Sequence, residues 1–158
     1  MKILWAPWRM GYIKKTKTKH CFLCKIIKEK ERERNFVLLQ TKKAISLLNI
    51  YPYNNGHTLV APLRHISSLK SLSPGEVKEL FLHTIKIVSA IKKVFKPSGF
   101  NVGLNLGRTA GAGLISHLHI HIVPRWEGDT NFMPVIGKTK IIPQSLEETY
   151  KKIKEKIS

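Results

Sequence analysis

Carboxylates are scarce in this chain of 158 residues. It has a single aspartate, Asp129, and nine glutamates, against 28 lysines and arginines. This shortage argues against catalytic carboxylate pairs, acidic calcium loops and two-metal phosphatase sites, because each of these needs several Asp or Glu side chains. The two cysteines, Cys21 and Cys24, are too few for a disulfide framework. Any reaction chemistry is therefore expected to depend on histidine or cysteine.

Long hydrophobic runs are also missing. No apolar stretch approaches the roughly 18 residues that a membrane-spanning helix needs, and the first residues, 1–9, lack the apolar core of a secretory signal peptide. With 42% hydrophobic residues, the composition is typical of one globular domain. We therefore expect a single-domain cytoplasmic protein in a reducing compartment, with no membrane partner.

Positive charge is concentrated near the start of the chain. Residues 1–43 hold 13 basic and 3 acidic side chains out of a formal net charge of +18. This basic segment 1–43, which begins with an expected N-terminal arm over residues 1–20, could bind nucleic acid, because phosphate neutralisation releases counterions. A solvated lysine-rich surface is favoured instead, since no aromatic residue interrupts the charged run 28–34 to stack on a base. In either case a positive field attracts anionic substrates. Trp5 and Trp8 in the arm are expected to dock on the core or on a second subunit.

Turn residues and apolar periodicity predict an α+β fold. Ser73-Pro74-Gly75-Glu76 provides an N-cap, a first-turn proline and a glutamate three residues after the cap, which opens a long helix. Short apolar runs separated by turn residues predict hairpins and therefore an antiparallel sheet. The expected strands are 36–40, 44–48, 56–62, 101–106 and 116–123, and the expected helices are 73–94 and 146–157.

The long helix is expected to bury one apolar stripe. His83 falls outside the main stripe and is expected to be an ordinary surface histidine. The stripe consists of residues that recur at helical spacing, namely Val77, Leu80, Phe81, Thr84, Ile85 and Val88.

Three histidines alternate with apolar residues in 117–123. On a strand, His117, His119 and His121 share one face, and the apolar residues between them share the other. Successive residues on one face are roughly 6.6–7 Å apart, so a zinc ion with bonds near 2.0–2.1 Å cannot gather all three from a regular strand. Such a row suits an extended polyanion such as a phosphate chain. The middle imidazole is the natural nucleophile toward phosphorus, if its other ring nitrogen donates a hydrogen bond that fixes the tautomer.

The loop just before the histidines, 107–113, consists almost entirely of small residues. It fits neither the Walker pattern nor the dinucleotide-binding fingerprint. Small residues allow backbone amides to approach phosphate oxygens closely, as in an anion-binding nest. A plain tight turn is the alternative, and the neighbouring histidines favour the nest.

The pattern His-φ-His-φ-His-φ-φ at 117–123 resembles the signature of the histidine triad (HIT) superfamily of nucleotidyl hydrolases and transferases. Asn49, followed eight residues later by His57, is similar to that family's ribose-binding asparagine and fourth active-site histidine. The segments 4–9 and 125–129 resemble the branch that contains diadenosine tetraphosphate phosphorylases and hydrolases. The resemblance implies a HIT-like fold, with a sheet of about five antiparallel strands, one long helix and a C-terminal helix. It divides the single domain 1–158 into an arm over 1–20, a HIT core over 21–135 and a tail over 136–158.

The same resemblance implies roles for the histidines. His119 would attack the α-phosphorus to give a nucleotidyl-histidine intermediate. The backbone carbonyl of His117 would orient His119, and His121 would contact the phosphate and the leaving group. His57 would complete the catalytic set, with Asn49 on the ribose. Pairing through the long helix and the sheet edge would make the protein a homodimer.

The resemblance also implies substrate contacts in the segment before the three histidines. Asn105 corresponds to a phosphate-contacting polar side chain. Gly113 stands where many relatives have glutamine, which shifts the expected phosphate contacts to the loop amides, including those of Gly111 and Gly113, and to Thr109. Imidazolium, loop amides and Arg108 would stabilise the charge of a pentavalent phosphorus.

Cys21 and Cys24 have the Cys-x-x-Cys spacing of half a tetrahedral zinc site. Zinc-binding members of the resembled superfamily complete such a site with a histidine at a strand end and the first triad histidine, which here are His65 and His117. We therefore expect a structural zinc on these four residues, the alternative being two inert cysteines. His20 is a spare candidate ligand.

The leading hypothesis is an enzyme that cleaves dinucleoside polyphosphates through His119, by phosphorolysis or hydrolysis. One alternative is a nucleoside phosphoramidase of the same superfamily. The other, from a different class, is a basic nucleotide- or nucleic-acid-binding module that grips a phosphate backbone with its arm.

Overall fold

The computed structural model describes residues 21–29, 31–130, 136 and 142–157. Within these residues no helix has the length and apolar character needed to cross a membrane. The elements in chain order are α2 (Phe22–Lys28), β1 (Val37–Gln40), β2 (Ala44–Leu48), β3 (Thr58–Pro62), the 3-10 turn η1 (Leu69–Ser71), α3 (Pro74–Phe95), β4 (Gly99–Leu104), β5 (Ile120–Arg125) and α5 (Leu146–Lys154).

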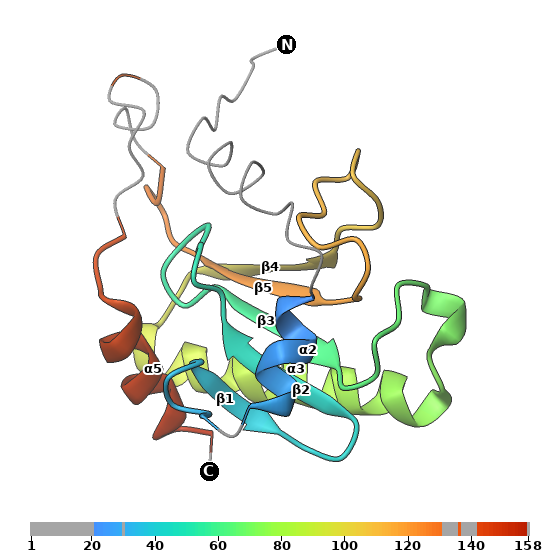
Figure 1. Cartoon of the computed structure of the whole chain (residues 1–158). Helices are drawn as coiled ribbons and strands as arrows, with labels where there is room; N and C mark the ends of the chain where they lie inside the picture. Colours follow the sequence, from blue (N-terminus) through green and yellow to red (C-terminus); the bar gives the residue numbers. More distant parts are fainter. Residues whose placement is uncertain (1–20, 30, 131–135, 137–141, 158) are drawn as a thin grey trace.

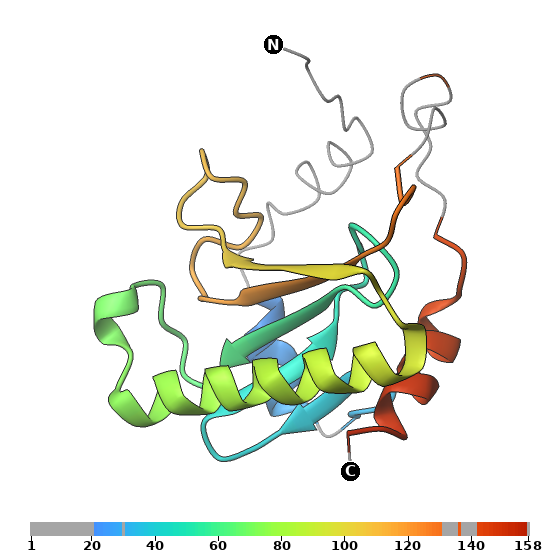
Figure 2. The same cartoon turned by 180° about the vertical axis from the view of Figure 1, so that it is seen from behind.

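The five strands form one sheet in the order β1-β2-β3-β5-β4, and every neighbouring pair is antiparallel. The long helix α3 crosses one face of the sheet, and α2 lies against the other (Figures 1 and 2). Helix α5 packs beside α3 and β1. The sequence prediction of an α+β fold with five antiparallel strands, one long helix and a C-terminal helix is confirmed.

Period-two alternation along the strands divides the buried residues between the two faces. Residue His121 on β5 is opposite Leu59 on β3, so it shares the α2 face, while Ile120 and Ile122 share the α3 face. The α3 face includes Leu38, Ala44, Leu48, Val60, Ile120 and Ile122 from the sheet, with Leu80, Ile87, Ala90, Ile91, Tyr150 and Ile153 from the helices, and the α2 face includes Leu23, Val37, Ile45, Leu47, Leu59 and Ala61.

Helix α3 begins where the sequence predicts, because the side chain of Ser73 accepts from the Glu76 N–H and the Glu76 carboxylate accepts from the Ser73 N–H. The predicted buried stripe is wrong in part. Val77, Phe81 and Ile85 are 41%, 61% and 59% exposed. The helix has two apolar stripes, and periodicity alone does not tell which one meets the sheet. The stripe that does is Leu80, His83, Thr84, Ile87, Ala90 and Ile91.

His83 is not a surface residue, contrary to the sequence prediction. Its side chain is 1% exposed. Nδ1 forms a hydrogen bond of 2.8 Å with the Ser46 hydroxyl of β2, and Nε2 forms one of 3.2 Å with the Thr41 hydroxyl. Two hydroxyl partners satisfy both ring nitrogens, so the imidazole can be buried.

Some boundaries also differ from prediction. Strand β5 begins at Ile120 rather than residue 116, and α5 ends at Lys154 rather than residue 157. Helix α2, which the sequence analysis does not predict, is capped by the Cys21 side chain, which accepts from the Cys24 N–H. The predictions for Trp5, Trp8, His20 and the arm over 1–20 lie outside the described residues. The division of the chain into one domain with an arm, a core and a tail stays a prediction.

Candidate active site and metal centre

The three triad histidines do not share one regular strand. The Leu118 N–H donates to the Ile66 carbonyl at 2.7 Å, so the segment before β5 runs beside the chain that follows β3. His117 thereby turns toward the two cysteines. His119 and His121 remain neighbours, with ring centroids 4.8 Å apart. The three histidines therefore divide between two clusters. His117 joins Cys21, Cys24 and His65 in a metal-type cluster, and His119 and His121 join His57 in a histidine cluster.

The tautomer of His119 follows from its partner. Its Nδ1 lies 2.8 Å from the backbone oxygen of His117. A carbonyl oxygen only accepts, so Nδ1 bears the proton and donates, and neutral His119 has its lone pair on Nε2. The side chain is 8% exposed, and desolvation lowers the pKa of His119. Near neutral pH this imidazole is therefore uncharged.

A second chain of hydrogen bonds orients His57 and His121. The backbone N–H of Tyr53 donates to His57 Nδ1 at 3.0 Å. Because a backbone N–H only donates, the proton of neutral His57 lies on Nε2, which is 2.9 Å from His121 Nδ1. His57 therefore donates to His121, and neutral His121 has its own proton on Nε2. The Tyr53 ring stacks on His121, with centroids 5.7 Å apart and planes at 13°.

Asn49 lies just after β2, next to His57. Its Oδ1 accepts from the Tyr51 N–H at 3.0 Å, which fixes the orientation of the amide, and its Nδ2 lies 3.3 Å from His57 Nδ1. The structure therefore brings together four of the predicted site residues, Asn49, His57, His119 and His121, on the α2 face of the sheet.

The predicted metal ligands form one cluster. The potential ligand atoms of Cys21, Cys24, His65 and His117 all lie within 4.8 Å of one another. Cys21 Sγ is 3.3 Å from His117 Nδ1, and Cys24 Sγ is 3.1 Å from His65 Nδ1. Tetrahedral zinc places such sulfur and nitrogen atoms roughly 3.6 Å apart. These separations fit a four-coordinate site.

A backbone hydrogen bond sets the tautomer of His117. Its Nε2 lies 2.9 Å from the Pro62 carbonyl at the end of β3, so Nε2 bears the proton and the Nδ1 lone pair points toward the cysteines. The donor set of two thiolates and two imidazoles is one that zinc prefers. The same residue presents its carbonyl to His119, and it therefore joins the metal cluster to the histidine cluster.

The loop between β4 and β5 contains the other predicted contacts. Gly107 and Gly111 have φ of +84° and +87°, a backbone conformation that glycine adopts without strain. The Gly111 N–H donates to the Arg108 carbonyl at 2.9 Å, so that amide already takes part in a turn. Thr109 is exposed, and Asn105, Gly111 and Gly113 are half-buried. An anion-binding role for this loop stays a prediction.

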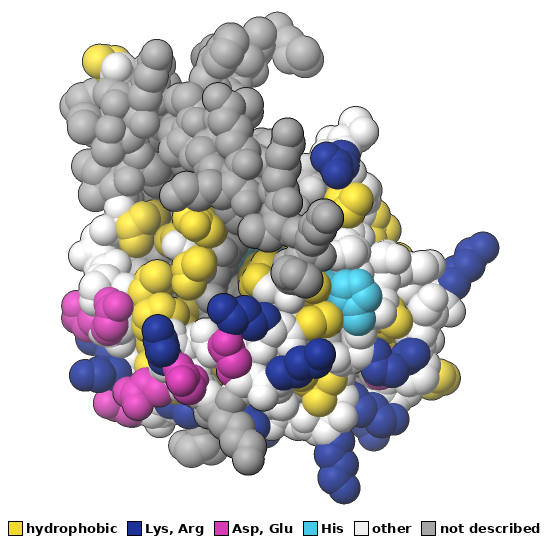
Figure 3. All heavy atoms as spheres, in the orientation of Figure 1, with side chains coloured by type: hydrophobic (Ala, Val, Ile, Leu, Met, Phe, Trp, Pro, Cys, Tyr) yellow, Lys and Arg dark blue, Asp and Glu magenta, His cyan; other side chains and the backbone are white. Residues whose placement is uncertain are grey.

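The face of the molecule that presents α2 has exposed basic side chains (Figure 3). An exposed histidine lies there among hydrophobic side chains, with Lys and Arg side chains near it. Basic side chains on this face favour the approach of an anionic substrate.

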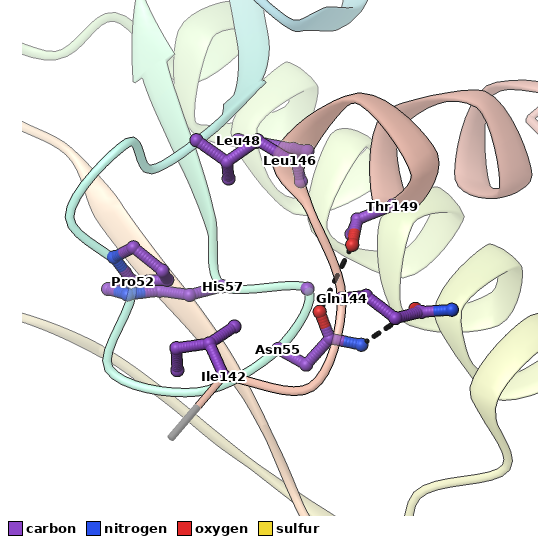
Figure 4. A pocket seen from close by; sticks show the side chains of 9 residues that line it. Leu48, Pro52, Asn55, His57, Ile142, Gln144, Leu146 and Thr149 are labelled. Atoms are coloured by element: carbon purple, nitrogen blue, oxygen red, sulfur yellow. Dashed lines mark hydrogen bonds between the residues drawn. The ribbon is translucent and has the colours of Figure 1, made fainter. Parts of the chain in front are cut away.

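A cavity of about 170 Å³ lies between the loop that contains His57 and the segment leading into α5 (Figure 4). Asn55 extends across it toward the C-terminal part of the chain, where its Oδ1 accepts from the Thr149 hydroxyl and its Nδ2 donates to Gln144 Oε1, both at 3.0 Å. The lining consists of Leu48, Pro52, Asn55, Gly56, His57, Ile142, Gln144, Leu146 and Thr149.

Sequence reasoning missed Tyr53 and Pro62, which act through backbone atoms and give no side-chain signal. It also assigned no role to Asn54 and Asn55, although both are 6% exposed. A buried pair of asparagines before Gly56 could have been suspected from the turn-forming Asn-Asn-Gly sequence.

Comparisons with known proteins place the sequence in a family. The profile of the HIT domain family matches residues 30–128. A protein of Mycobacterium tuberculosis named AP-4-A phosphorylase is 43% identical over 154 residues, covering 92% of this chain and 79% of that protein. A Schizosaccharomyces pombe protein named bis(5'-nucleosyl)-tetraphosphatase [asymmetrical] is 39% identical over 93 residues, covering 59% of this chain and 50% of that protein.

A solved structure has the same fold. A protein of Sulfolobus tokodaii described as a hypothetical histidine triad nucleotide-binding protein superposes with a TM-score of 0.69 at 32% identity, covering 87% of this chain and 91% of that one. The resemblance inferred from the sequence motifs is therefore confirmed, and the chain belongs to the HIT domain family and is a HIT-type enzyme.

Proposed function

We propose that the protein cleaves dinucleoside polyphosphates of the diadenosine tetraphosphate type by transferring a nucleotidyl group to His119. The observation that supports this most directly is the hydrogen bond from His119 Nδ1–H to the His117 carbonyl, which leaves the Nε2 lone pair free for attack. The names of the relatives from Mycobacterium tuberculosis and Schizosaccharomyces pombe support the substrate class.

In the first step, His119 Nε2 attacks the α-phosphorus, a P–N bond forms, and the P–O bond to the leaving nucleotide breaks. The His121 proton on Nε2 is suited to a hydrogen bond with the leaving oxygen, because His57 Nε2–H occupies His121 Nδ1. The His117 carbonyl lies beside the ring that gains positive charge. Asn49 is proposed to contact the ribose, and Asn105, Thr109, Gly111 and Gly113 to line the phosphate side.

In the second step, phosphate or water attacks the nucleotidyl-histidine, the P–N bond breaks and His119 is regenerated. Phosphate gives a nucleoside diphosphate, and water gives a monophosphate. Incubation with diadenosine tetraphosphate, with and without inorganic phosphate, distinguishes the two acceptors: ADP plus ATP indicates a phosphorylase, and AMP plus ATP indicates a hydrolase. Adenosine phosphoramidate in a parallel assay tests the phosphoramidase alternative. Failure to cleave diadenosine tetraphosphate under both conditions would contradict the proposal, and cleavage of the phosphoramidate alone would favour the alternative.

A structural zinc ion on Cys21, Cys24, His65 and His117 forms a second part of the proposal. The donor set and separations described above support it. When bound, zinc would supply a cross-link between the start of α2, the chain after β3 and the segment before β5, and no step of the reaction passes through it. A reducing cytoplasmic location would keep both thiols available as ligands.

A homodimer is the third part. Phe81 and Ile85 on α3 and Val102 on the edge strand β4 are 61%, 59% and 50% exposed. These side chains lie on the outer side of α3 and on an open sheet edge, surfaces that proteins commonly cover by association. A second copy of the chain packed through α3 and β4 would bury them.

A further inference from the structure

Asp129, the only aspartate of the chain, is buried in a turn just after β5. Its side chain is 8% exposed, and four hydrogen bonds to it come from described residues. Three come from its own turn: Arg125 Nε at 2.6 Å, Arg125 Nη2 at 2.9 Å and the Trp126 N–H at 3.1 Å. The fourth comes from Asn54 Nδ2 at 2.9 Å, across 75 residues of sequence. Asp129 thus joins the end of β5 to the loop that contains His57.

Asn54 is held firmly by this contact. It is 6% exposed, and its amide nitrogen donates both to Asp129 Oδ2 and to the Pro124 carbonyl, the latter at 3.0 Å. Both partners only accept, so the amide has one satisfied orientation. On the far side of the carboxylate, Arg125 Nη1 donates to Asn101 Oδ1 on β4 at 2.8 Å. The Asn54 side chain is therefore held directly at the end of β5, and Asp129 and Arg125 connect it to β4.

The backbone on either side of Asn54 sets the orientation of His57. The Asn54 carbonyl accepts from the His57 N–H at 3.2 Å, which closes a turn around Gly56, whose φ is +72°. The preceding peptide presents the Tyr53 N–H to His57 Nδ1. A shift of Asn54 would therefore displace the His57 main chain and the Tyr53 N–H, which is the closer of the two described donors to His57 Nδ1, the other being Asn49 Nδ2 at 3.3 Å.

We infer that Asp129 is a positioning residue for His57 and, through it, for His121. Its carboxylate holds Asn54, Asn54 holds the turn over 53–57, and that turn keeps the His57 proton on Nε2, directed at His121 Nδ1. The hydrogen bonds described here link the carboxylate to Arg125, Trp126 and Asn54, and Asn54 is the link that leads to His57. The catalytic consequence rests on the proposed function, whereas the tautomer of His57 does not.

The neighbouring residue offers a matched control. Asn55 is equally buried, but its side chain faces the other way, toward Thr149 and Gln144 at the start of α5 (Figure 4). Thr149→Val removes one buried hydrogen bond to the same loop at nearly constant volume. It should destabilise the fold without disturbing Tyr53, Asn54 or His57.

The test compares Asp129→Asn with Thr149→Val in the full-length protein. Two-bond ¹H–¹⁵N spectra of the imidazoles at pH 8 report the tautomer without substrate. We expect His57 to show the Nε2–H pattern in the parent protein and in Thr149→Val, and a mixed pattern in Asp129→Asn. With diadenosine tetraphosphate, kcat of Asp129→Asn should fall about 10-fold, with KM changed less than about twofold and kcat of Thr149→Val near that of the parent.

Asn54→Ala provides a second variant if Asp129→Asn does not fold, and it should give the same mixed pattern. A parent-like His57 spectrum in the folded variants would overturn the inference, as would an equal change in Thr149→Val. If the parent protein cleaves no dinucleoside polyphosphate, the proposed function fails, and the imidazole spectra still decide the positioning role.

Discussion

Glu76 offers a quantitative test of how the chain after β3 is attached to α3. Its carboxylate is 4% exposed and accepts from Arg64 Nε and Nη2, both at 2.7 Å, and from the Ser73 N–H at 2.8 Å. The Arg64 guanidinium, ahead of the Ser73 hydrogen bonds, lowers the pKa of Glu76 from 4.5 to about 2. Arg64 directly precedes His65, so this ion pair also anchors one of the proposed zinc ligands.

The size of the effect follows from linkage. A carboxyl whose pKa falls from 4.5 to about 2 on folding contributes about 3 kcal/mol of stability at neutral pH. Because the Arg64 side chain is 57% exposed, solvent screens part of this, and about 2 kcal/mol is expected. The folded pKa is depressed, so the contribution is fully present above pH 4.5 and is lost as the pH falls toward 2.

Glu76→Gln keeps the side-chain size and removes the charge. Urea unfolding at pH 7 should show the variant about 2 kcal/mol less stable than the parent, and at pH 3 this difference should shrink to less than half. Glu148→Gln, which alters an exposed pair with Lys152, is the control and should change little at either pH. A difference that is absent at pH 7, or equal at both pH values, would refute the reasoning.

Three further predictions concern other parts of the molecule. Burial lowers the pKa of His83, so below pH 6.5 the unfolded state binds a proton more readily than the folded state does. The parent should therefore lose stability between pH 7 and pH 5 relative to His83→Asn. An equal pH dependence of urea unfolding in the two proteins would contradict this. The parent protein should be a dimer and Phe81→Lys a monomer in light scattering after gel filtration, with Lys86→Glu on the same helix remaining dimeric; a monomeric parent would contradict the proposed homodimer. Cys24→Ser should lose stoichiometric zinc in elemental analysis and unfold at lower urea, whereas the parent, purified without chelator, should contain one zinc per chain.

The sequence predicted those features whose causes are local. The N-terminus of α3 follows from the Ser73 and Glu76 capping box, and the hairpin strands follow from short apolar runs with a polar turn. The cluster of Cys21, Cys24, His65 and His117 was also predicted, from Cys-x-x-Cys spacing together with the family resemblance. The helix start and the hairpins are determined by residues that are close in the sequence, and the Cys/His cluster was predicted because the resembled family has the same set of residues.

Features that depend on distant partners were not predictable in this way. His83 is buried because Ser46 and Thr41, from other parts of the chain, satisfy its ring nitrogens. The apolar stripe of α3 that meets the sheet is decided by packing, which periodicity does not encode. His117 leaves the triad row because the segment around Leu118 pairs with the chain after β3 rather than continuing β5.

The central claim is that His119 Nε2 is the nucleophile, and trapping the covalent intermediate tests it most directly. The protein would be mixed rapidly with diadenosine tetraphosphate in phosphate-free buffer, quenched under alkaline conditions that preserve a P–N bond, digested and analysed by mass spectrometry. We expect one adenylyl group on the peptide that contains His119, and none in His119→Ala. Turnover by His119→Ala at the parent rate, or an adenylyl group on a different residue, would contradict it.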